Sequence, residues 1–138
     1  MYCVYRNTRG NAVYIDFVGS ISEGLLNDYD KDHEGHSGFT NSQIEANVYT
    51  YLDFQRTLGT PVDIALLHIG TNDVAAGIQS AADVAAILDE IDRYESDNAT
   101  TIWVVLARII NRNCSVDTPV CDESLDTTDF NDAVAAMV

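Results

Sequence analysis

The apolar residues of this chain follow two patterns, short runs and helical stripes. The runs at residues 12–18 and 101–110 are rich in β-branched and aromatic residues, and the run at 63–69 contains four consecutive apolar residues, Ile64 to Leu67. All three runs predict strands. The stripes at residues 43–58 and 80–94 place apolar side chains three or four positions apart and predict amphipathic helices. Because strands and helices alternate, we expect an α/β fold with a parallel sheet between two helical layers, the flavodoxin-like three-layer α/β/α architecture.

The beginnings of these helices carry residue types that favour helix caps. Asn41 or Ser42 is expected to cap the first helix, and Ser80 is expected to begin the second. Thr127 or Thr128 is expected to cap a last helix that runs to the end of the sequence. Since no internal repeat, low-complexity tract or linker interrupts the chain, residues 1–138 are expected to form a single, partial domain.

Polar residues follow the strand at 63–69 directly, in the order Gly70-Thr71-Asn72-Asp73. The carboxyl ends of parallel strands form the ligand-binding edge of open α/β sheets. The side-chain amide of Asn72 is therefore expected where its N–H groups can meet a developing negative charge. A plain strand-to-helix turn, with Asn72 or Asp73 as the helix cap, explains these residue types equally well.

A second polar stretch, DKDHEGHSGFT from Asp30 to Thr40, follows a strand that ends in IDFVGS. Together with LLHIGTND further along, these segments resemble the SGNH (GDSL-like) hydrolases, in particular their carbohydrate-esterase-like branch. The resemblance extends from about Val13 to Val105 and preserves the order and spacing of the segments. It implies hydrolysis of a carboxylic ester, most specifically carbohydrate O-deacetylation, by a serine nucleophile through an acyl-enzyme, without a metal or organic cofactor.

The resemblance also implies roles for individual residues. In this family an oxyanion hole is formed by the N–H of the nucleophile, a glycine N–H and an asparagine side chain. Asn72 matches the asparagine. Gly35 or Gly38 matches the glycine, and Gly35 is preferred because Gly-His-Ser follows it. A glycine there lets the backbone approach the substrate without an intervening Cβ. The other residues of the two segments that are expected to contact the substrate are Gly38, His36, Thr71 and Asp73.

Two segments of such a hydrolase are missing from the sequence. No Gly-Asp-Ser occurs, and the last third of the chain has no Asp-x-x-His. Asp30 and His33 fit the second pattern, but they precede the Gly35 segment, where the family carries a loop at the substrate rim. The chain is therefore expected to be a fragment of an esterase. The alternatives are a catalytically inactive SGNH-fold protein that binds carbohydrate or serves as a scaffold, and a flavodoxin-like domain that is not a hydrolase.

The missing first segment has a consequence for the sheet. The family fold places its nucleophile-bearing first strand in the centre, between the counterparts of residues 12–18 and 63–69. Without that strand, both neighbours would leave backbone donors and acceptors unpaired. If the chain is the whole product, these two strands are expected to pair directly, or the protein is expected to dimerise.

Several serines and histidines lie near the resembling segments. Ser20 and Ser37 are the nearest replacement nucleophiles, but neither lies in a Gly-x-Ser-x-Gly elbow. His33 is expected to be a solvated or rim histidine. His36 is expected to lie beside the oxyanion glycine, and His68 to be a satisfied histidine of the sheet.

The balance of 22 acidic to 7 basic residues gives a formal charge of −15. This charge excludes a surface that tracks nucleic-acid phosphates and disfavours anionic membranes. It suits a secreted protein with a neutral substrate such as an acylated sugar, although solubility alone also explains it. The acidic residues at 28–34 lack the spacing of a calcium-binding EF-hand loop and are expected to be solvated. No apolar stretch is long enough to span a bilayer.

Cysteines and glycosylation sequons give a further indication of compartment. Cys114 and Cys121 can close a small disulfide-bonded loop in an oxidising compartment, which leaves Cys3 unpaired. Sequons begin at Asn98 and Asn113. Both features favour a secreted protein.

Overall fold

The computed structural model describes residues 2–9, 12–23, 30–78, 81–110 and 123–137. Strands and helices are mixed along the chain, which confirms the α/β class predicted from the apolar pattern. In chain order the elements are β1 (Tyr2–Arg9), β2 (Ala12–Val18), β3 (Ile21–Ser22), β4 (Asp32–His33), α1 (Asn41–Thr57), β5 (Ile64–Leu67), α2 (Thr71–Ala76), α3 (Ala81–Asn98), β6 (Trp103–Leu106) and α4 (Glu123–Ala135).

The main sheet has four strands in the order β2-β1-β5-β6. β5 and β6 run parallel, with Ile64 opposite Trp103 and Leu67 opposite Leu106. β1 is antiparallel to both of its neighbours, β2 and β5. The sheet is therefore mixed, whereas the alternation of elements predicts a parallel one. A separate pair of two-residue strands, β3 and β4, lies above the end of β2.

The gap expected in the centre of this sheet is not present. β1 lies between β2 and β5 and pairs with seven residues of β2 and three residues of β5. Its backbone satisfies the inner edges of both strands, so neither direct pairing nor dimerisation is needed to do so. The sequence carries a signal for this hairpin in Gly10-Asn11, a dipeptide typical of two-residue hairpin turns, between two runs of β-forming residues.

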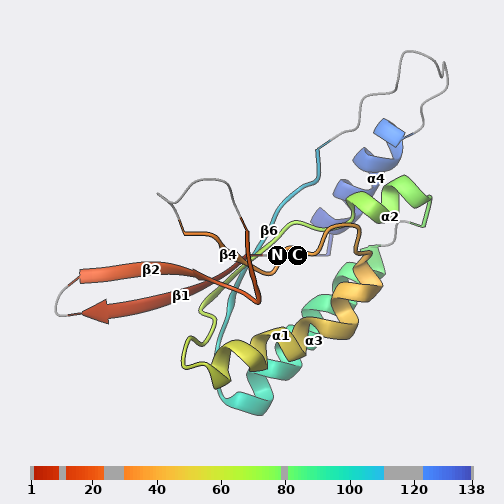
Figure 1. The fold of residues 1–138 in the computed structure, drawn as a ribbon. Coiled ribbons are helices and arrows are strands. Elements are labelled where there is room, and N and C mark those ends of the chain that lie inside the picture. The colour runs from red at the N-terminus through yellow and green to blue at the C-terminus, as the bar shows by residue number, and fades with distance from the viewer. Residues whose placement is uncertain (1, 10–11, 24–29, 79–80, 111–122, 138) are drawn as a thin grey trace.

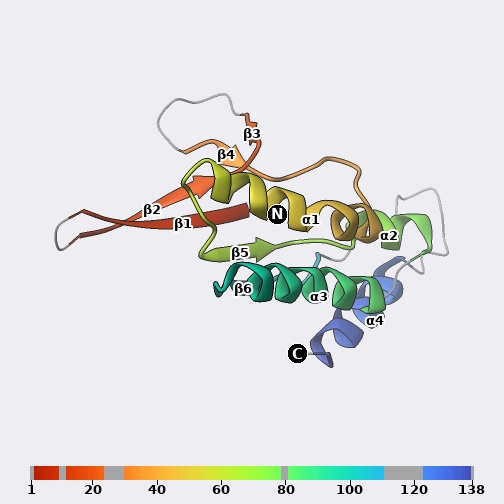
Figure 2. The same ribbon diagram turned by 90° about the horizontal axis from the view of Figure 1, so that it is seen from below.

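Helices α1 and α3 pack side by side over one face of the sheet, as Figures 1 and 2 show. Ala65 and Leu67 of β5 are fully buried beneath this helical layer. Burial of such apolar side chains removes their surface from water, which is the dominant favourable contribution to folding. The residues that α1 and α3 contribute to the core are Ile44, Val48, Leu52, Val84, Ile87, Ile91 and Tyr94.

The opposite face of the sheet carries no helix within the described ranges. Trp103 and Val105 of β6 point to this side and are 71% and 53% exposed, whereas Val104 and Leu106 pack against the core. The described residues therefore form two layers, and the expected three-layer arrangement is not established. No helix in these ranges is long and apolar enough to cross a membrane.

Several element boundaries differ from those expected. The strand expected at 63–69 is Ile64–Leu67, and the helix expected at 80–94 continues to Asn98. The run at residues 101–110 is regular strand only in β6. Thr40, one residue before the expected cap, is the N-cap of α1, and its N–H donates to Oε1 of Gln43 at 3.0 Å. α4 begins at Glu123, so Thr127 lies inside the helix and is fully buried instead of capping it.

Candidate active site

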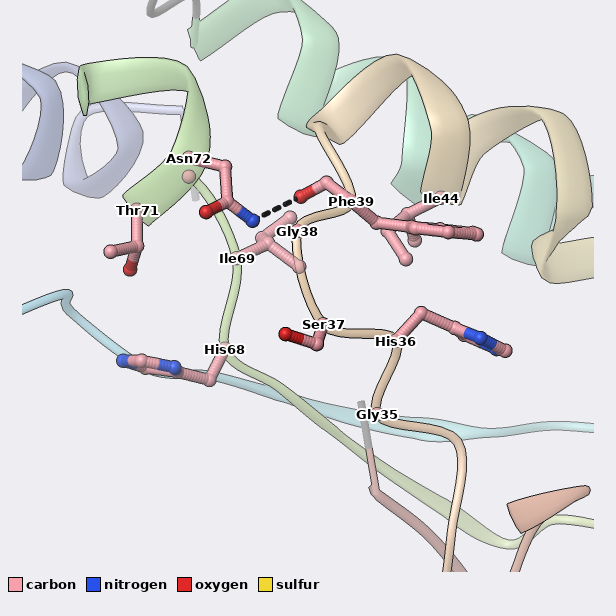
Figure 3. A pocket seen from close by; sticks show the side chains of 11 residues that line it. Gly35, His36, Ser37, Gly38, Phe39, Ile44, His68, Ile69, Thr71 and Asn72 are labelled. Carbon is pink, nitrogen blue, oxygen red and sulfur yellow. Dashed lines mark hydrogen bonds between the residues drawn. The ribbon is translucent and has the colours of Figure 1, made fainter. Parts of the chain in front are cut away.

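A pocket of about 340 Å³ lies where two segments approach each other. One segment, residues 35–39, precedes α1, and the other, residues 68–72, connects β5 to α2 (Figure 3). These are the two segments that the sequence predicts at the active edge, and the fold brings them together. Of the six predicted site residues, five line the pocket: Gly35, His36, Gly38, Thr71 and Asn72. The lining is completed by Ser37, Phe39, Ile44, His68, Ile69 and Gly70.

Gly70 makes the turn from β5 into α2. Its φ of 99° lies in the left-handed region that favours glycine, and a Cβ at this position would overlap the ring of Phe130 from α4. Gly70 is also the N-cap of α2, so the cap is not Asn72 or Asp73. The turn places Thr71 and Asn72 at the pocket in the first turn of the helix.

Asn72 connects the two walls of the pocket. Its Nδ2 donates to the carbonyl oxygen of Phe39 at 2.7 Å (Figure 3). A primary amide has two N–H groups, so this bond fixes the orientation of the side chain and leaves a second donor. A fixed N–H beside a pocket is the group that an oxyanion requires.

Asp73 lies behind the pocket wall instead of in it, contrary to the expectation that it contacts the substrate. It is 1% exposed, and its two carboxylate oxygens accept the backbone N–H of Asn41 at 3.1 and 3.0 Å. Burial raises the pKa of the Asp73 carboxyl above 3.8, and the bond from Asn41 partly opposes that effect. The side chain therefore holds the first turn of α1 against the first turn of α2.

The two candidate oxyanion glycines differ in their surroundings. The backbone N–H of Gly35 donates to Nδ1 of His33 at 3.0 Å, and this bond occupies the donor that an oxyanion role requires. Gly38 has a φ of 82°, and a Cβ there would meet nothing within 4 Å. The backbone N–H of Gly35 is thus engaged by His33, whereas the space beside the Cα of Gly38 is open.

Glu34 is buried at 1% exposure, contrary to the expectation that the acidic residues at 28–34 are solvated, because three donors converge on its carboxylate. Its Oε2 accepts the backbone N–H of Ser20 at 2.8 Å, and its Oε1 accepts the Ser20 hydroxyl at 2.8 Å. Nε2 of His36 lies 2.7 Å from the same Oε1. Because the carboxylate lies between the serine and the histidine, the Ser20 hydroxyl is not activated by the imidazole, which argues against Ser20 as a replacement nucleophile.

The ring of His36 is stacked between two aromatic rings. Its centroid lies 4.7 Å from that of Phe39 and 4.9 Å from that of Tyr51, at interplanar angles of 19° and 20°. In Figure 3 the ring points away from Asn72. His36 thus belongs to the pocket lining, and its ring packs against Tyr51 of α1.

His68 differs from its expected role as a satisfied histidine of the sheet. β5 ends at Leu67, so His68 follows the strand, is exposed and lines the pocket. Ser37 is also exposed and lines the pocket, and its hydroxyl points into the space between the two segments (Figure 3).

Of the acidic residues before Glu34, Asp30 accepts hydrogen bonds from the backbone. Asp30 accepts the backbone N–H of Phe17 at 2.6 Å and that of Asp32 at 3.2 Å. Within the described ranges no three His, Cys, Asp or Glu residues are arranged to hold a metal ion. Asp28 lies outside those ranges.

The residues that bear on compartment are only partly described. Cys114, Cys121 and the sequon at Asn113 lie outside the described residues, as does the side chain of Cys3. At the other sequon, the amide of Asn98 donates to the carbonyl of Tyr94 at 2.9 Å and closes the last turn of α3.

Comparison with known proteins supports the resemblance found in the sequence. No family model and no curated protein sequence matches the chain. Among solved structures, a family 3 carbohydrate esterase of Clostridium thermocellum superposes with a TM-score of 0.66 at 28% sequence identity. The chain resembles a carbohydrate esterase in both fold and sequence. The match covers 89% of this chain and 52% of the esterase, so the chain spans about half of that protein's length.

Proposed function

We propose that the pocket is the oxyanion-stabilising part of an SGNH-type carbohydrate esterase site, and that the intact protein is a carbohydrate O-deacetylase. The observation that carries this proposal is the convergence of the two predicted segments, with the Asn72 amide held by the carbonyl of Phe39 at 2.7 Å. The similarity to a carbohydrate esterase supports the same chemistry.

The proposed reaction is acyl transfer to a serine, followed by attack of water on the acyl-enzyme. The free N–H of Asn72 and the backbone N–H of Gly38 would stabilise the oxyanion of each tetrahedral intermediate. Gly35 can take part only if its N–H leaves Nδ1 of His33. Thr71 borders the same space and is proposed to contact the sugar or the acyl group. No metal or organic cofactor is needed for these steps.

The nucleophile and the His–Asp pair are proposed to come from polypeptide outside these 138 residues. Gly-Asp-Ser is absent from the sequence, and its last third has no Asp-x-x-His. The esterase to which the chain is similar is about twice as long as the matched region. Sequencing the native transcript in both directions tests this point: in-frame Gly-Asp-Ser upstream and Asp-x-x-His downstream are expected, and stop codons at both ends would contradict it.

In the intact protein, the bare face of the sheet is proposed to be covered, which would complete the three-layer fold. Trp103 is the single tryptophan of the chain and is 71% exposed on that face. Acrylamide should quench its fluorescence strongly in these 138 residues. In the intact protein, the difference between the emission of the wild type and that of Trp103→Phe isolates the emission of Trp103. This emission should lie at shorter wavelength than in the 138-residue chain and should be quenched less by acrylamide. Equal quenching in both proteins would contradict a third layer.

A neutral ester substrate and secretion are proposed from the sequence. The formal charge of −15 opposes binding to nucleic acid and to anionic membranes. Carbohydrate esters carry no charge that this surface would repel. Secretion rests on the cysteines and sequons, and a disulfide between Cys114 and Cys121 in the native protein would support it.

The second candidate function is that of an inactive carbohydrate-binding or scaffold protein, which the absence of Gly-Asp-Ser and of a C-terminal Asp-x-x-His from the sequence favours. Labelling of the native protein by a fluorophosphonate distinguishes the two. An esterase should be labelled at its serine, and prior denaturation should abolish labelling. A native protein that binds acetylated oligosaccharides but is not labelled would support the second function and reject the first.

A further inference from the structure

Glu34 holds the first pocket segment to the end of β2. It is 1% exposed and lies immediately before residues 35–39, which form that segment. Ser20, two residues after β2 ends, gives it both a backbone and a side-chain hydrogen bond at 2.8 Å. The backbones of the two regions are also in close contact, because a Cβ on Gly19 would overlap the carbonyl of His33 and the nitrogen of Glu34.

The hydrogen bonds around Glu34 determine where the proton of His36 lies. A carboxylate can only accept, and its two oxygens face the Ser20 N–H, the Ser20 hydroxyl and Nε2 of His36. Nε2 must therefore carry a proton. The neutral ring is then the Nε2–H tautomer.

The orientation of this ring bears on Asn72. His36 stacks on Phe39 at a centroid separation of 4.7 Å, and the carbonyl of Phe39 accepts the Asn72 amide at 2.7 Å. We infer that Glu34 is a positioning residue for the pocket: its carboxylate holds the ring of His36 through Nε2, and the held ring packs on Phe39, so that the Phe39 carbonyl can orient the Asn72 amide. The Nε2–H tautomer is the signature of this contact. The catalytic meaning of this inference rests on the proposed function, whereas its structural content does not.

The variant Glu34→Gln makes a specific prediction. A glutamine has the same shape but one acceptor oxygen and one NH2 group. The Ser20 N–H can only donate, so the amide oxygen must take the Oε2 position. The NH2 group then faces the Ser20 hydroxyl and Nε2 of His36, and Nε2 must become an acceptor. The His36 proton is therefore expected to move to Nδ1 while the pocket keeps its shape.

The test is nitrogen-15 NMR of the 138-residue chain, which reports which ring nitrogen carries the proton and where the Asn72 side-chain NH2 resonates. We expect a protonated Nε2 in the wild type, a protonated Nδ1 in Glu34→Gln, and an unchanged Asn72 NH2 signal in both. In Glu34→Ala, which removes the contacts, the Asn72 NH2 signal should move. Glu90→Gln, which removes a charge from α3 beside Arg93, serves as the control and should change neither signal.

An unprotonated Nε2 in the wild type, or an unchanged tautomer in Glu34→Gln, would overturn the inference. An unshifted Asn72 signal in a folded Glu34→Ala variant would also overturn it. If Glu34→Ala does not fold, the Glu34→Gln result still decides. None of these measurements requires esterase activity, so failure of the proposed function and failure of this inference remain separate results.

Discussion

The Asn72 side-chain amide and the Phe39 carbonyl, 33 residues apart in sequence, are joined by a hydrogen bond of 2.7 Å. This bond connects the turn after β5 to the segment before α1 and thus fastens one wall of the pocket to the other. It also sets the direction of the remaining Asn72 N–H. A donor that is already held in place needs no reorientation when negative charge develops beside it. The bond to Phe39 therefore prepares the remaining Asn72 N–H to stabilise such a charge.

Gly38→Ala is expected to have two separate effects, a loss of stability from backbone strain and a loss of activity from the added Cβ in the pocket. At a φ of 82°, alanine should cost about 1–2 kcal/mol of stability. Its Cβ would enter space that has no heavy atom within 4 Å, where a substrate would lie. We expect a large loss of ester hydrolysis by the intact protein in addition to that modest destabilisation, measured by kcat/KM and by urea unfolding.

Gly59→Ala is the matched control, because Gly59 has a φ of 81° and equally open surroundings but follows the end of α1. It should lose a similar amount of stability and keep its activity. Equal activity in the two variants would show that Gly38 has no role in the reaction.

Gly70→Ala tests whether the turn and α4 are packed as one unit. The left-handed φ of 99° should cost roughly 1–3 kcal/mol, and overlap with Phe130 should add to it. Phe130→Ala should itself cost about 3–5 kcal/mol, since Phe130 is 5% exposed. In the double variant the overlap is absent. The double variant should therefore lose less stability than the sum of the losses in the two single variants. Strict additivity in urea unfolding would show that the contact is not formed.

The buried carboxyl of Asp73 should make stability depend on pH. Burial raises its pKa above 3.8 in the folded protein, so the folded state binds more protons than the unfolded state in the range just above that value. The free energy of unfolding should therefore fall as pH rises through this range. Asp73→Asn keeps an acceptor for the Asn41 N–H and lacks the ionisation. Urea unfolding from pH 3.5 upward should show the wild type losing stability relative to this variant, and parallel curves would contradict the account.

The sequence allows the segments of the site to be predicted, because their signals are local. The polar end of an apolar strand identifies residues 70–73 without reference to the rest of the fold, and the resemblance to the SGNH hydrolases adds residues 35–38. The helices α1 and α3 follow from their apolar stripes in the same way.

The remaining features depend on contacts between distant segments. Burial of Glu34 could not be predicted, since a glutamate in a polar loop is buried only where donors such as Ser20 and His36 converge on it. Local pattern also does not show that Asp73 faces Asn41 instead of the pocket. The apolar run at 63–69 suggests that His68 is buried, but the strand ends one residue before it.

Asn72→Ala in the intact protein tests the central claim most directly. Loss of the amide donor should lower kcat for an acetylated oligosaccharide by roughly 10²-fold or more. The fold should be retained, because the side chain is only half-buried at the pocket edge. The predicted result is therefore a much lower kcat with a nearly unchanged thermal unfolding temperature. Full activity in the Asn72→Ala variant would contradict the assignment of this pocket as an oxyanion-stabilising site.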